Sequence, residues 1–307
     1  MATPRLTVIT PAFNHGLFIE RTVCSVLDQG CRDVEYLVID AGSLDDTTFV
    51  LRDYEDSLTW WESRRHGQIA AAVNEALLRA KGQWVWIVPA GDVLLPCAVD
   101  AVLREIEQHE DRPGWFVAGC ERINEQDESL CGLDTLQVGE LGRLLLHDRE
   151  AQPLAGMVFS RDLVAGVGML DESVREMYGL ELQCRLLASG IEPTRLSSMV
   201  AGIREYDDVV DAQVTLTRGI EAIEIAERYT DALPLGQRYA LMRVCDQRRR
   251  IQALAAAELF GERARPYLWQ AVKDQPKWLT DKRVRHALVH GPAQAVPLDD
   301  RITRRAA

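Results

Sequence analysis

Apolar residues follow two different spacings in the first third of the chain. Four short runs rich in β-branched and aromatic residues are typical of strands buried in a sheet; they cover residues 5–10, 35–39, 58–62 and 84–88. After each run, apolar residues recur at every third or fourth position, which predicts a helix. This alternation up to residue 109 predicts an α/β fold with a mostly parallel sheet and helices on both of its faces.

The remaining chain divides into a mixed part and a helical part. Further strands are expected at residues 115–119, 156–160 and 197–203, and helices at residues 141–146 and 176–189. Beyond about residue 211 the apolar residues show helical spacing alone. We therefore expect a sheet domain over residues 1–210, a helical domain over residues 211–292 and a flexible tail over residues 293–307.

Composition narrows the class of protein. A chain of 307 residues is long enough for one large domain and a smaller one, and its net charge of −12 argues against a nucleic-acid partner. Neither a bilayer-spanning apolar run nor a signal-peptide layout is visible. The seven cysteines lack a C-x-x-C pair and resemble buried thiols of a reducing compartment. We expect a cytoplasmic protein with at most peripheral contact at the inner face of the membrane.

Residues 83–96, QWVWIVPAGDVLLP, contain the strand around which we expect the sheet to be organised. The strand ends at Pro89, and Pro96 is a suitable first residue for a helix. Ligands of open α/β sheets bind at the carboxyl ends of the strands. Asp92 therefore stands where a carboxylate can hold a metal ion or a sugar hydroxyl, although a turn or helix-capping role is the alternative.

Asp40 follows the run of residues 35–39 in the same way. Its carboxylate is placed to accept a hydrogen bond from a nucleobase N–H, or to act as a solvated turn residue. The first strand–helix turn, PAFNHG, lacks the G-x-G-x-x-G pattern, so we do not expect a Rossmann dinucleotide site.

Four segments resemble, in the right order, those of the family-2 glycosyltransferases, which adopt the GT-A fold. They are LTVITPAFNHGLFIERTVCSVLDQG, EYLVIDAGSLDDT, GQIAAAVNEALLRAKGQWVWIVPAGDVLLPCAV and FSRDLVAGVGMLDES. The resemblance covers roughly residues 5–205. It implies an inverting enzyme that moves a sugar from a UDP-, GDP- or dTDP-sugar to a glycan or lipid-linked acceptor, in cell-surface polysaccharide or glycan biosynthesis.

The resemblance also assigns roles to individual residues. The nucleoside pocket would be lined by Pro11, Ala12, Phe13 and Asp40, and Gln68 would face the diphosphate. Asp92 would hold a divalent cation, Mn or Mg, whose shell substrate phosphates and waters complete. Two further residues and one loop have open roles. Asn74 matches a family Asn, or is a helix-face residue that supports the loop before its helix. Arg204 either reaches the diphosphate or forms a surface ion pair, and the loop of residues 64–66 either meets the diphosphate or is solvated.

Two departures from the family pattern affect the predicted chemistry. Only Asp92 is left of the acidic motif, because residues 89–91 replace its other acids. The segment YGLELQCR, residues 178–185, matches the family's "Glu-Asp-x-Asp-Leu-x-x-Arg", and Gly179 stands where the catalytic base is expected. Glu181, at the second acid position, is our preferred base, and Glu176 is the other candidate; an ordinary helix-surface glutamate is the alternative for both.

The missing acids motivate a second hypothesis. The chain would then be a non-catalytic family member that binds a nucleotide sugar or a partner protein. A nucleotidyltransferase is a third possibility, and the absence of a Gly-rich phosphate loop counts against it.

Overall fold

The computed structural model describes residues 3–31, 33–108, 114–133, 140–146, 152–205, 212–260, 268–269, 272–273 and 275–290. Contacts divide the chain into two compact units. The first comprises Met1–Val209 with Asp231–Leu233, and the second comprises Val210–Thr230 with Pro234–Ala307. The tail expected over residues 293–307 lies outside the described residues.

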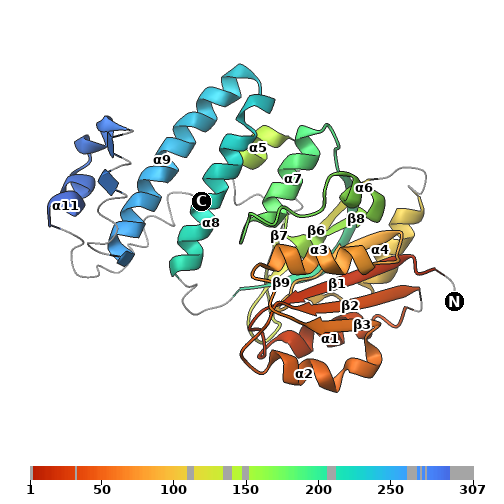
Figure 1. The fold of residues 1–307 in the computed structure, drawn as a ribbon. Helices are drawn as coiled ribbons and strands as arrows, with labels where there is room; N and C mark the ends of the chain where they lie inside the picture. The colour runs from red at the N-terminus through yellow and green to blue at the C-terminus, as the bar shows by residue number, and fades with distance from the viewer. Residues whose placement is uncertain are drawn as a thin grey trace. The chain divides into compact units, whose positions relative to one another are not determined.

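The first unit is built on a nine-stranded sheet with the order β3-β2-β1-β4-β8-β6-β9-β5, and β7 pairs with β6 (Figure 1). One half is parallel and consists of the four strands expected first: β1 (Leu6–Ala12), β2 (Val34–Asp40), β3 (Trp60–Ser63) and β4 (Trp84–Ile87). The α/β fold class and this half of the sheet are therefore as predicted.

The other half of the sheet corrects the expectation of mostly parallel pairing. Strand β8 (Met157–Ser160) is antiparallel to both β4 and β6 (Trp115–Ile123), whereas β9 (Thr194–Arg204) is parallel to β6. The sequence did not predict β5 (Val93–Leu94) or β7 (Ser129–Leu133), which pair antiparallel with β9 and β6. Strand β5 has two residues and β7 is largely exposed, so neither carries a buried-strand pattern.

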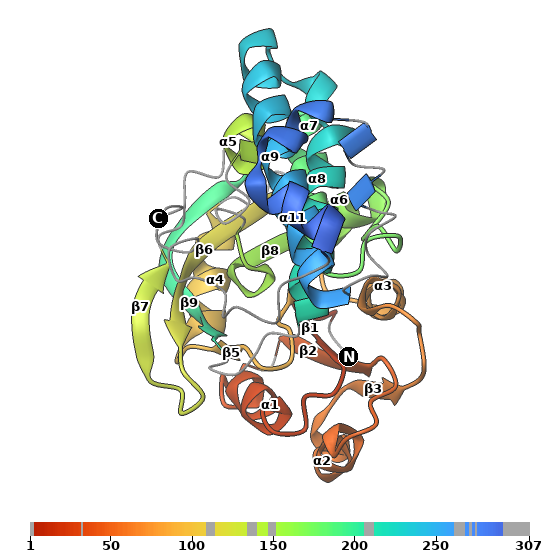
Figure 2. The same cartoon turned by 90° about the vertical axis from the view of Figure 1, so that its left-hand side faces the viewer.

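Helices cover both faces of the sheet. The core of one face contains residues of α1 (Ile19–Leu27), α2 (Thr47–Asp53) and α4 (Ala98–Glu107). The core of the other contains residues of α3 (Ile69–Arg79), α6 (Arg161–Gly166) and α7 (Tyr178–Ala188). Figures 1 and 2 show α3 on the opposite side of the strands from α1 and α2.

Strand β4 is buried on both faces, as its charge-free sequence predicted. Trp84 and Trp86 belong to the core shared with α1 and α4, whereas Val85 and Ile87 belong to the core shared with α3 and α7. Successive side chains of a strand point to opposite faces, so every residue of β4 is apolar. The unit also contains α5 (Leu141–Leu146), which contacts α7, and the 3-10 turns Glu55–Ser57 and Leu154–Gly156.

The second unit contains α8 (Ala212–Arg228), α9 (Leu235–Phe260), the 3-10 helix η6 (Pro276–Thr280) and α11 (Lys282–His290). Its core brings together apolar side chains of these elements, including Leu216, Leu254, Trp278 and Val284. All regular structure in its described residues is helical, as the spacing beyond residue 211 indicated. None of the described helices is both long and apolar enough to cross a membrane.

The cysteines are all free thiols. Three are buried as expected, Cys24 and Cys31 are partly buried, and the other two are at the surface. Cys97 and Cys131 are exposed, because Cys97 precedes the first turn of α4 and Cys131 lies on the exposed strand β7.

Candidate functional site

The carboxyl ends of β1, β2 and β4 meet at one edge of the sheet. Ala12 pairs with Asp40 in the register of β1 and β2, and the Ala41 N–H donates to the Ala12 carbonyl at 2.8 Å. On the other side of β1, the Ala90 N–H donates to the Pro11 carbonyl at 2.9 Å. The end of β1, where Phe13 is partly exposed, therefore lies between the segments that carry Asp40 and Asp92.

Asp40 is fully buried and its carboxylate shapes the loop after β2. It accepts hydrogen bonds from the N–H of Gly42 (3.2 Å), the N–H of Ser43 (3.0 Å) and the hydroxyl of Ser63 (2.6 Å), and also from the Ser43 hydroxyl. Gly42 has φ +94°, and a Cβ there would lie 3.0 Å from the Cα of Arg65. Asp40 thus holds two loops together, and its expected role toward a nucleobase stays a prediction.

The loop between β3 and α3 contains two buried polar atoms without a hydrogen-bond partner among the described residues: Nε2 of His66 and Oε1 of Gln68. The His66 side chain is 7% exposed, and burial lowers its pKa, with the Arg64 charge acting in the same direction. Burial therefore favours the neutral form of the imidazole. Buried polar groups are normally satisfied, so these two atoms indicate a place for a polar ligand or ordered water.

The arginines of this loop have different surroundings. Arg64 pairs with the carboxylates of Glu75 and Glu62. Arg65 is exposed, with its backbone packed close to Gly42. Both side chains are exposed, and the Arg64 charge is in addition paired with carboxylates at the surface.

Asp92 lies just beyond β4 and is held by two other elements. Its Oδ1 accepts the backbone N–H of Arg204 at 3.1 Å, and its carbonyl accepts the Thr22 hydroxyl at 2.8 Å. Burial raises the pKa of Asp92 to about 7, and the N–H and charge of Arg204 oppose this rise. Among the described residues, three or more His, Cys, Asp or Glu side chains nowhere gather as a metal centre would require.

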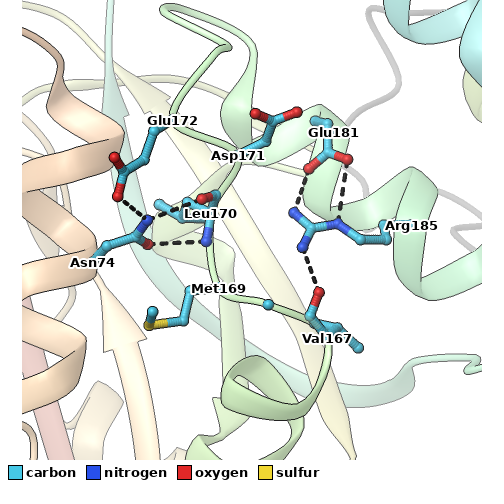
Figure 3. A pocket seen from close by; sticks show the side chains of 9 residues that line it. Asn74, Val167, Met169, Leu170, Asp171, Glu172, Glu181 and Arg185 are labelled. Carbon is cyan, nitrogen blue, oxygen red and sulfur yellow. Dashed lines mark hydrogen bonds and ion pairs between the residues drawn. The ribbon is translucent and has the colours of Figure 1, made fainter.

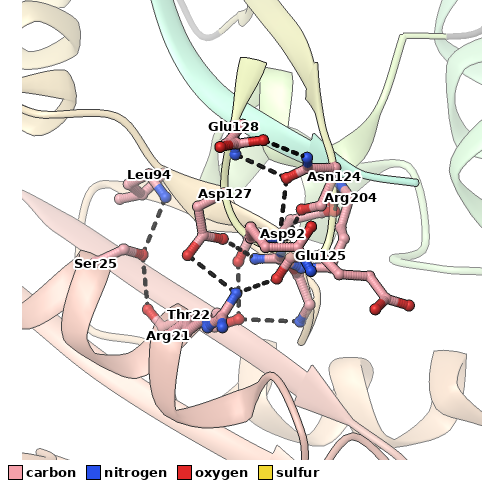
Figure 4. A network of polar contacts seen from close by, with 12 residues as sticks. Arg21, Thr22, Ser25, Asp92, Leu94, Asn124, Glu125, Asp127, Glu128 and Arg204 are labelled. Atoms are coloured by element: carbon pink, nitrogen blue, oxygen red, sulfur yellow. Dashed lines mark hydrogen bonds and ion pairs between the residues drawn. The ribbon is translucent and has the colours of Figure 1, made fainter. Parts of the chain in front are cut away.

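Arg204 is buried rather than at the surface, which corrects the expected alternative of a surface ion pair. Its Nε donates to the Gly91 carbonyl at 2.8 Å, its Nη1 to the Asn124 carbonyl, and its Nη2 pairs with Asp127. Its guanidinium also lies over the Phe18 ring, 4.7 Å from the centroid. Figure 4 shows this network, which ties the end of β9 to the acidic segment.

A pocket of ≈ 570 Å³ lies between α3, the loop of residues 167–172 and α7 (Figure 3). Asn74 of α3 holds this loop: its amide nitrogen donates to the Leu170 carbonyl and to Glu172, and its oxygen accepts the Leu170 N–H, each at 2.9 Å. Asn74 therefore supports a loop, but it is the loop of residues 167–172 and not the loop before α3 that the sequence suggested. The pocket is also lined by Asp171, Glu181 and Arg185.

Glu181 lines this pocket from the first turn of α7 and is almost fully buried. Arg185 binds both of its carboxylate oxygens, and the Arg185 Nη1 also donates to the Val167 carbonyl at 2.6 Å. The helix begins at Tyr178, so Glu176 precedes it, whereas we had expected a helix from residue 176. Glu176 is partly exposed and does not line the pocket.

Gly179 has little room for a larger side chain. A Cβ there would lie 3.1 Å from Cγ of Leu154, so Leu154 would have to shift. The position at which the family base is expected is thus partly filled by an apolar neighbour.

Sequence reasoning missed two carboxylates of the pocket, Asp171 and Glu172. Asp171 accepts from the backbone and hydroxyl of Ser173, at 2.9 and 2.6 Å, and in Figure 3 it lies between Asn74 and the Glu181–Arg185 pair. The signal was present as the Asp-Glu of GMLDES, which had supported only the fold.

Comparison with known proteins gives one family and one fold. Residues 7–122 match the family model for glycosyl transferase family 2. An uncharacterized glycosyltransferase of Mycobacterium tuberculosis, found in two strains, is 29% identical over 178 residues, which are 55% of this chain and 64% of the relative. The chain thus spans less than two thirds of the length of this relative.

Two solved structures share the fold. The complex of Staphylococcus aureus TarS 1–349 with UDP-GlcNAc matches with TM-score 0.55 and 12% identity, over 92% of this chain and 88% of TarS 1–349. The mannosyltransferase PcManGT of Pyrobaculum calidifontis, in complex with GDP-Man and Mn2+, matches with TM-score 0.50 and 20% identity, over 94% of this chain and 84% of its own.

Proposed function

We propose that this chain, which belongs to glycosyltransferase family 2 through residues 7–122, transfers a sugar from a nucleoside-diphosphate sugar to a hydroxyl acceptor with inversion. The observation that carries the proposal is the meeting of three strand ends, which brings residues 11–13, Asp40 and Asp92 to one edge of the sheet. Ligands of open α/β sheets bind at this edge.

The donor nucleotide would bind across this edge. Pro11, Ala12 and Phe13 would contact the nucleoside, with Asp40 beside it, and Gln68 would face the diphosphate. The unpartnered atoms of His66 and Gln68 support a polar ligand at this loop, because binding would satisfy them. The two similar structures were solved in complex with UDP-GlcNAc and with GDP-Man, which supports a nucleotide sugar as donor without selecting the base.

The acceptor would enter the ≈ 570 Å³ pocket beside α7. There a carboxylate would take the proton of the attacking hydroxyl as a general base. Glu181 is our proposed base, since it lines the pocket and occupies a family acid position, and Glu176 remains the second candidate. Arg185 would keep the Glu181 carboxylate oriented. The acceptor class that we propose is a glycan or lipid-linked saccharide of cell-surface polysaccharide biosynthesis.

A divalent cation, Mn or Mg, would enter together with the donor. Asp92 supplies a single carboxylate, with one oxygen already bonded to the Arg204 N–H. One carboxylate fits a cation whose remaining ligands are phosphates and waters, but not a pre-formed centre. When bound, such a cation would stabilise charge on the departing diphosphate. Arg204 would position Asp92 and not the diphosphate, because its guanidinium is already occupied.

The crowding at Gly179 favours a second candidate function, a non-catalytic member that binds a nucleotide sugar or a partner protein. An aspartate could not take the place of Gly179 without movement of Leu154. The family match favours transfer of a sugar over transfer of a nucleotidyl group.

A thermal-shift panel of UDP-, GDP- and dTDP-sugars, with and without Mn, tests the proposal. A bound donor raises the unfolding midpoint by mass action. Release of nucleoside diphosphate with an acceptor saccharide then separates transfer from binding alone. No shift with any donor would contradict both candidates that bind a nucleotide sugar, whereas a shift without turnover would favour the non-catalytic one. Asp53→Asn, an exposed carboxylate on α2, is the matched control for changes at Asp40 and Asp92.

A further inference from the structure

The C-terminal quarter of the chain has a charge opposite in sign to that of the whole. Residues 234–307 contain 15 Lys and Arg and 7 Asp and Glu, a formal net charge of +8, whereas the full chain carries −12. Charge asymmetry of this kind is typical of a segment that meets an anionic surface.

The first half of α9 presents apolar side chains to solvent. Leu235, Tyr239 and Met242 are 71%, 70% and 61% exposed. At about 100° of rotation per residue, the three lie within about 60° of one another and form a stripe along the helix. Arg243, also exposed, follows Met242 directly.

A different side of the same helix packs inside the second unit. Leu241 and Cys245 are buried, and α9 contacts α8. The stripe of Leu235, Tyr239 and Met242 is therefore not the face that stabilises the helix pair. Large apolar residues aligned on the exposed side of a helix mark an interaction surface, whereas scattered single ones need no explanation.

We propose that the beginning of α9 binds the surface of an anionic lipid bilayer. Leu235 and Met242 enter the boundary between headgroups and acyl chains, and the Tyr239 ring lies at headgroup level with its hydroxyl toward water. Arg243 faces lipid phosphates. The second unit as a whole contains 17 Lys and Arg and 11 Asp and Glu, and this net charge of +6 attracts it to the surface from a distance. An apolar face flanked by basic residues is the arrangement of helices that lie in this interface.

The positive charge of the segment and the small area of the stripe favour a lipid bilayer over a protein or a nucleic acid as the partner. A stable protein interface buries about 800 Å² on each partner, which three side chains do not supply. Nucleic acid would bind mainly through its phosphates, which do not contact an apolar stripe. An anionic bilayer can interact with both features of the helix, because its headgroups attract the basic residues and its acyl chains accommodate the apolar side chains.

Sedimentation of the full chain with vesicles tests the proposal. Vesicles of phosphatidylcholine with phosphatidylglycerol are compared with vesicles of phosphatidylcholine alone, at low and at high salt. We expect binding to the anionic vesicles, with loss of most of it on neutral vesicles and a decrease at high salt, where surface charges are screened. No nucleotide sugar or acceptor is present, so failure of the transferase proposal would leave this result unaffected.

Variants then separate the apolar and charged contributions. The triple change Leu235→Ser, Tyr239→Ser and Met242→Ser is expected to lower the partition coefficient roughly tenfold or more. Arg243→Glu is expected to lower it roughly fivefold or more. The matched control removes three exposed apolar side chains from the first unit, Leu78→Ser, Leu130→Ser and Met199→Ser, and is expected to bind as the wild type does. All variants are first compared by circular dichroism and thermal unfolding.

Four results would overturn the proposal. The first is binding to neutral vesicles as strong as binding to anionic ones, and the second is unchanged vesicle binding by a folded triple variant. The third is a loss of vesicle binding in the control variant equal to that in the triple variant. The fourth is binding of the protein to an oligonucleotide without any binding to anionic vesicles. Analytical ultracentrifugation adds a fifth: a wild-type dimer that the triple variant converts to monomer, without vesicle binding, would assign the stripe to a second copy of this chain.

Discussion

Asp92 accepts the backbone N–H of Arg204 across 3.1 Å, although 112 residues separate the two in the chain. The guanidinium of the same arginine binds the carbonyl of Gly91. Strand β9 therefore ends on the acidic segment that follows β4, and the single acid left at this strand end is positioned by a residue from the far end of the unit.

Burial of Asp92 predicts a pH-dependent contribution to stability. Its pKa is about 7 in the folded protein, against an ordinary value of 3.8. Because the folded state binds the proton more tightly, this stabilising contribution is present below about pH 4 and is lost as the pH rises through about 7. The Asp92→Asn variant lacks this contribution. In calorimetry, we therefore expect the unfolding midpoint of Asp92→Asn minus that of the wild type to increase as the pH rises from about 5 to about 8. The same trend in Asp53→Asn, or none in Asp92→Asn, would contradict this account.

Removal of the Asp40 carboxylate is expected to weaken nucleotide binding. Asp40→Ala should cost roughly 1–3 kcal/mol of binding free energy, the range for a hydrogen bond to a charged group. It also leaves the N–H groups of Gly42 and Ser43 without their acceptor, so the midpoint should fall as well. Asp40→Asn keeps an acceptor oxygen and separates the two effects. Titration calorimetry with the best donor measures the affinity. An unchanged affinity in a folded Asp40→Ala variant would count decisively against a nucleotide-binding role for Asp40.

Glu181→Gln is expected to lower turnover roughly 10²–10⁴-fold with little change in donor affinity, because a general base acts in the transition state. The change also alters the contact with Arg185, so the unfolding midpoint must be followed in parallel. Asp171→Asn, in the same pocket, is the matched comparison. If Glu181→Gln and Glu176→Gln both retain full turnover, the base lies elsewhere. A wild type without transfer from any donor would favour the non-catalytic function.

Metal binding is expected to depend on the donor. With one carboxylate, the free protein should bind Mn or Mg weakly, and a nucleoside diphosphate should tighten binding because its phosphates complete the shell. The cation needs the ionised carboxylate, so affinity should decrease as the pH falls below about 7. Titration of Mn followed by electron paramagnetic resonance, with and without the diphosphate, measures both effects. Tight binding without nucleotide, or equal binding by Asp92→Asn, would contradict this expectation.

Asn74→Ala is expected to loosen the loop of residues 167–172. Three hydrogen bonds join Asn74 to Leu170 and Glu172, and their loss should cost roughly 1–3 kcal/mol. Hydrogen exchange should rise in this loop while the amides of β1 and β4 keep their protection. Faster exchange throughout the first unit would instead mean that Asn74 stabilises the whole sheet.

The sequence by itself determined the elements whose signal is local. Strands β1 to β4, the helices that follow them, and the helical character of the described residues 212–290 were all predicted from spacing. Burial of a strand on both faces requires a continuous apolar run, as in Trp84–Ile87, and a helix packed on one side requires apolar residues every three or four positions. These requirements act within a few residues, so the chain displays them directly.

Tertiary structure decided everything that depends on distant partners. The strands β5 and β7 exist because β9 and β6 offer free edges, and their own residues carry no buried pattern. The pairing of Asn74 with Leu170, the burial of Arg204 and the raised pKa of Asp92 each join segments at least 77 residues apart. Local spacing records which side of an element is apolar, but not which element will cover it. The surroundings of the candidate site residues therefore depend on tertiary contacts between segments that are distant in the sequence.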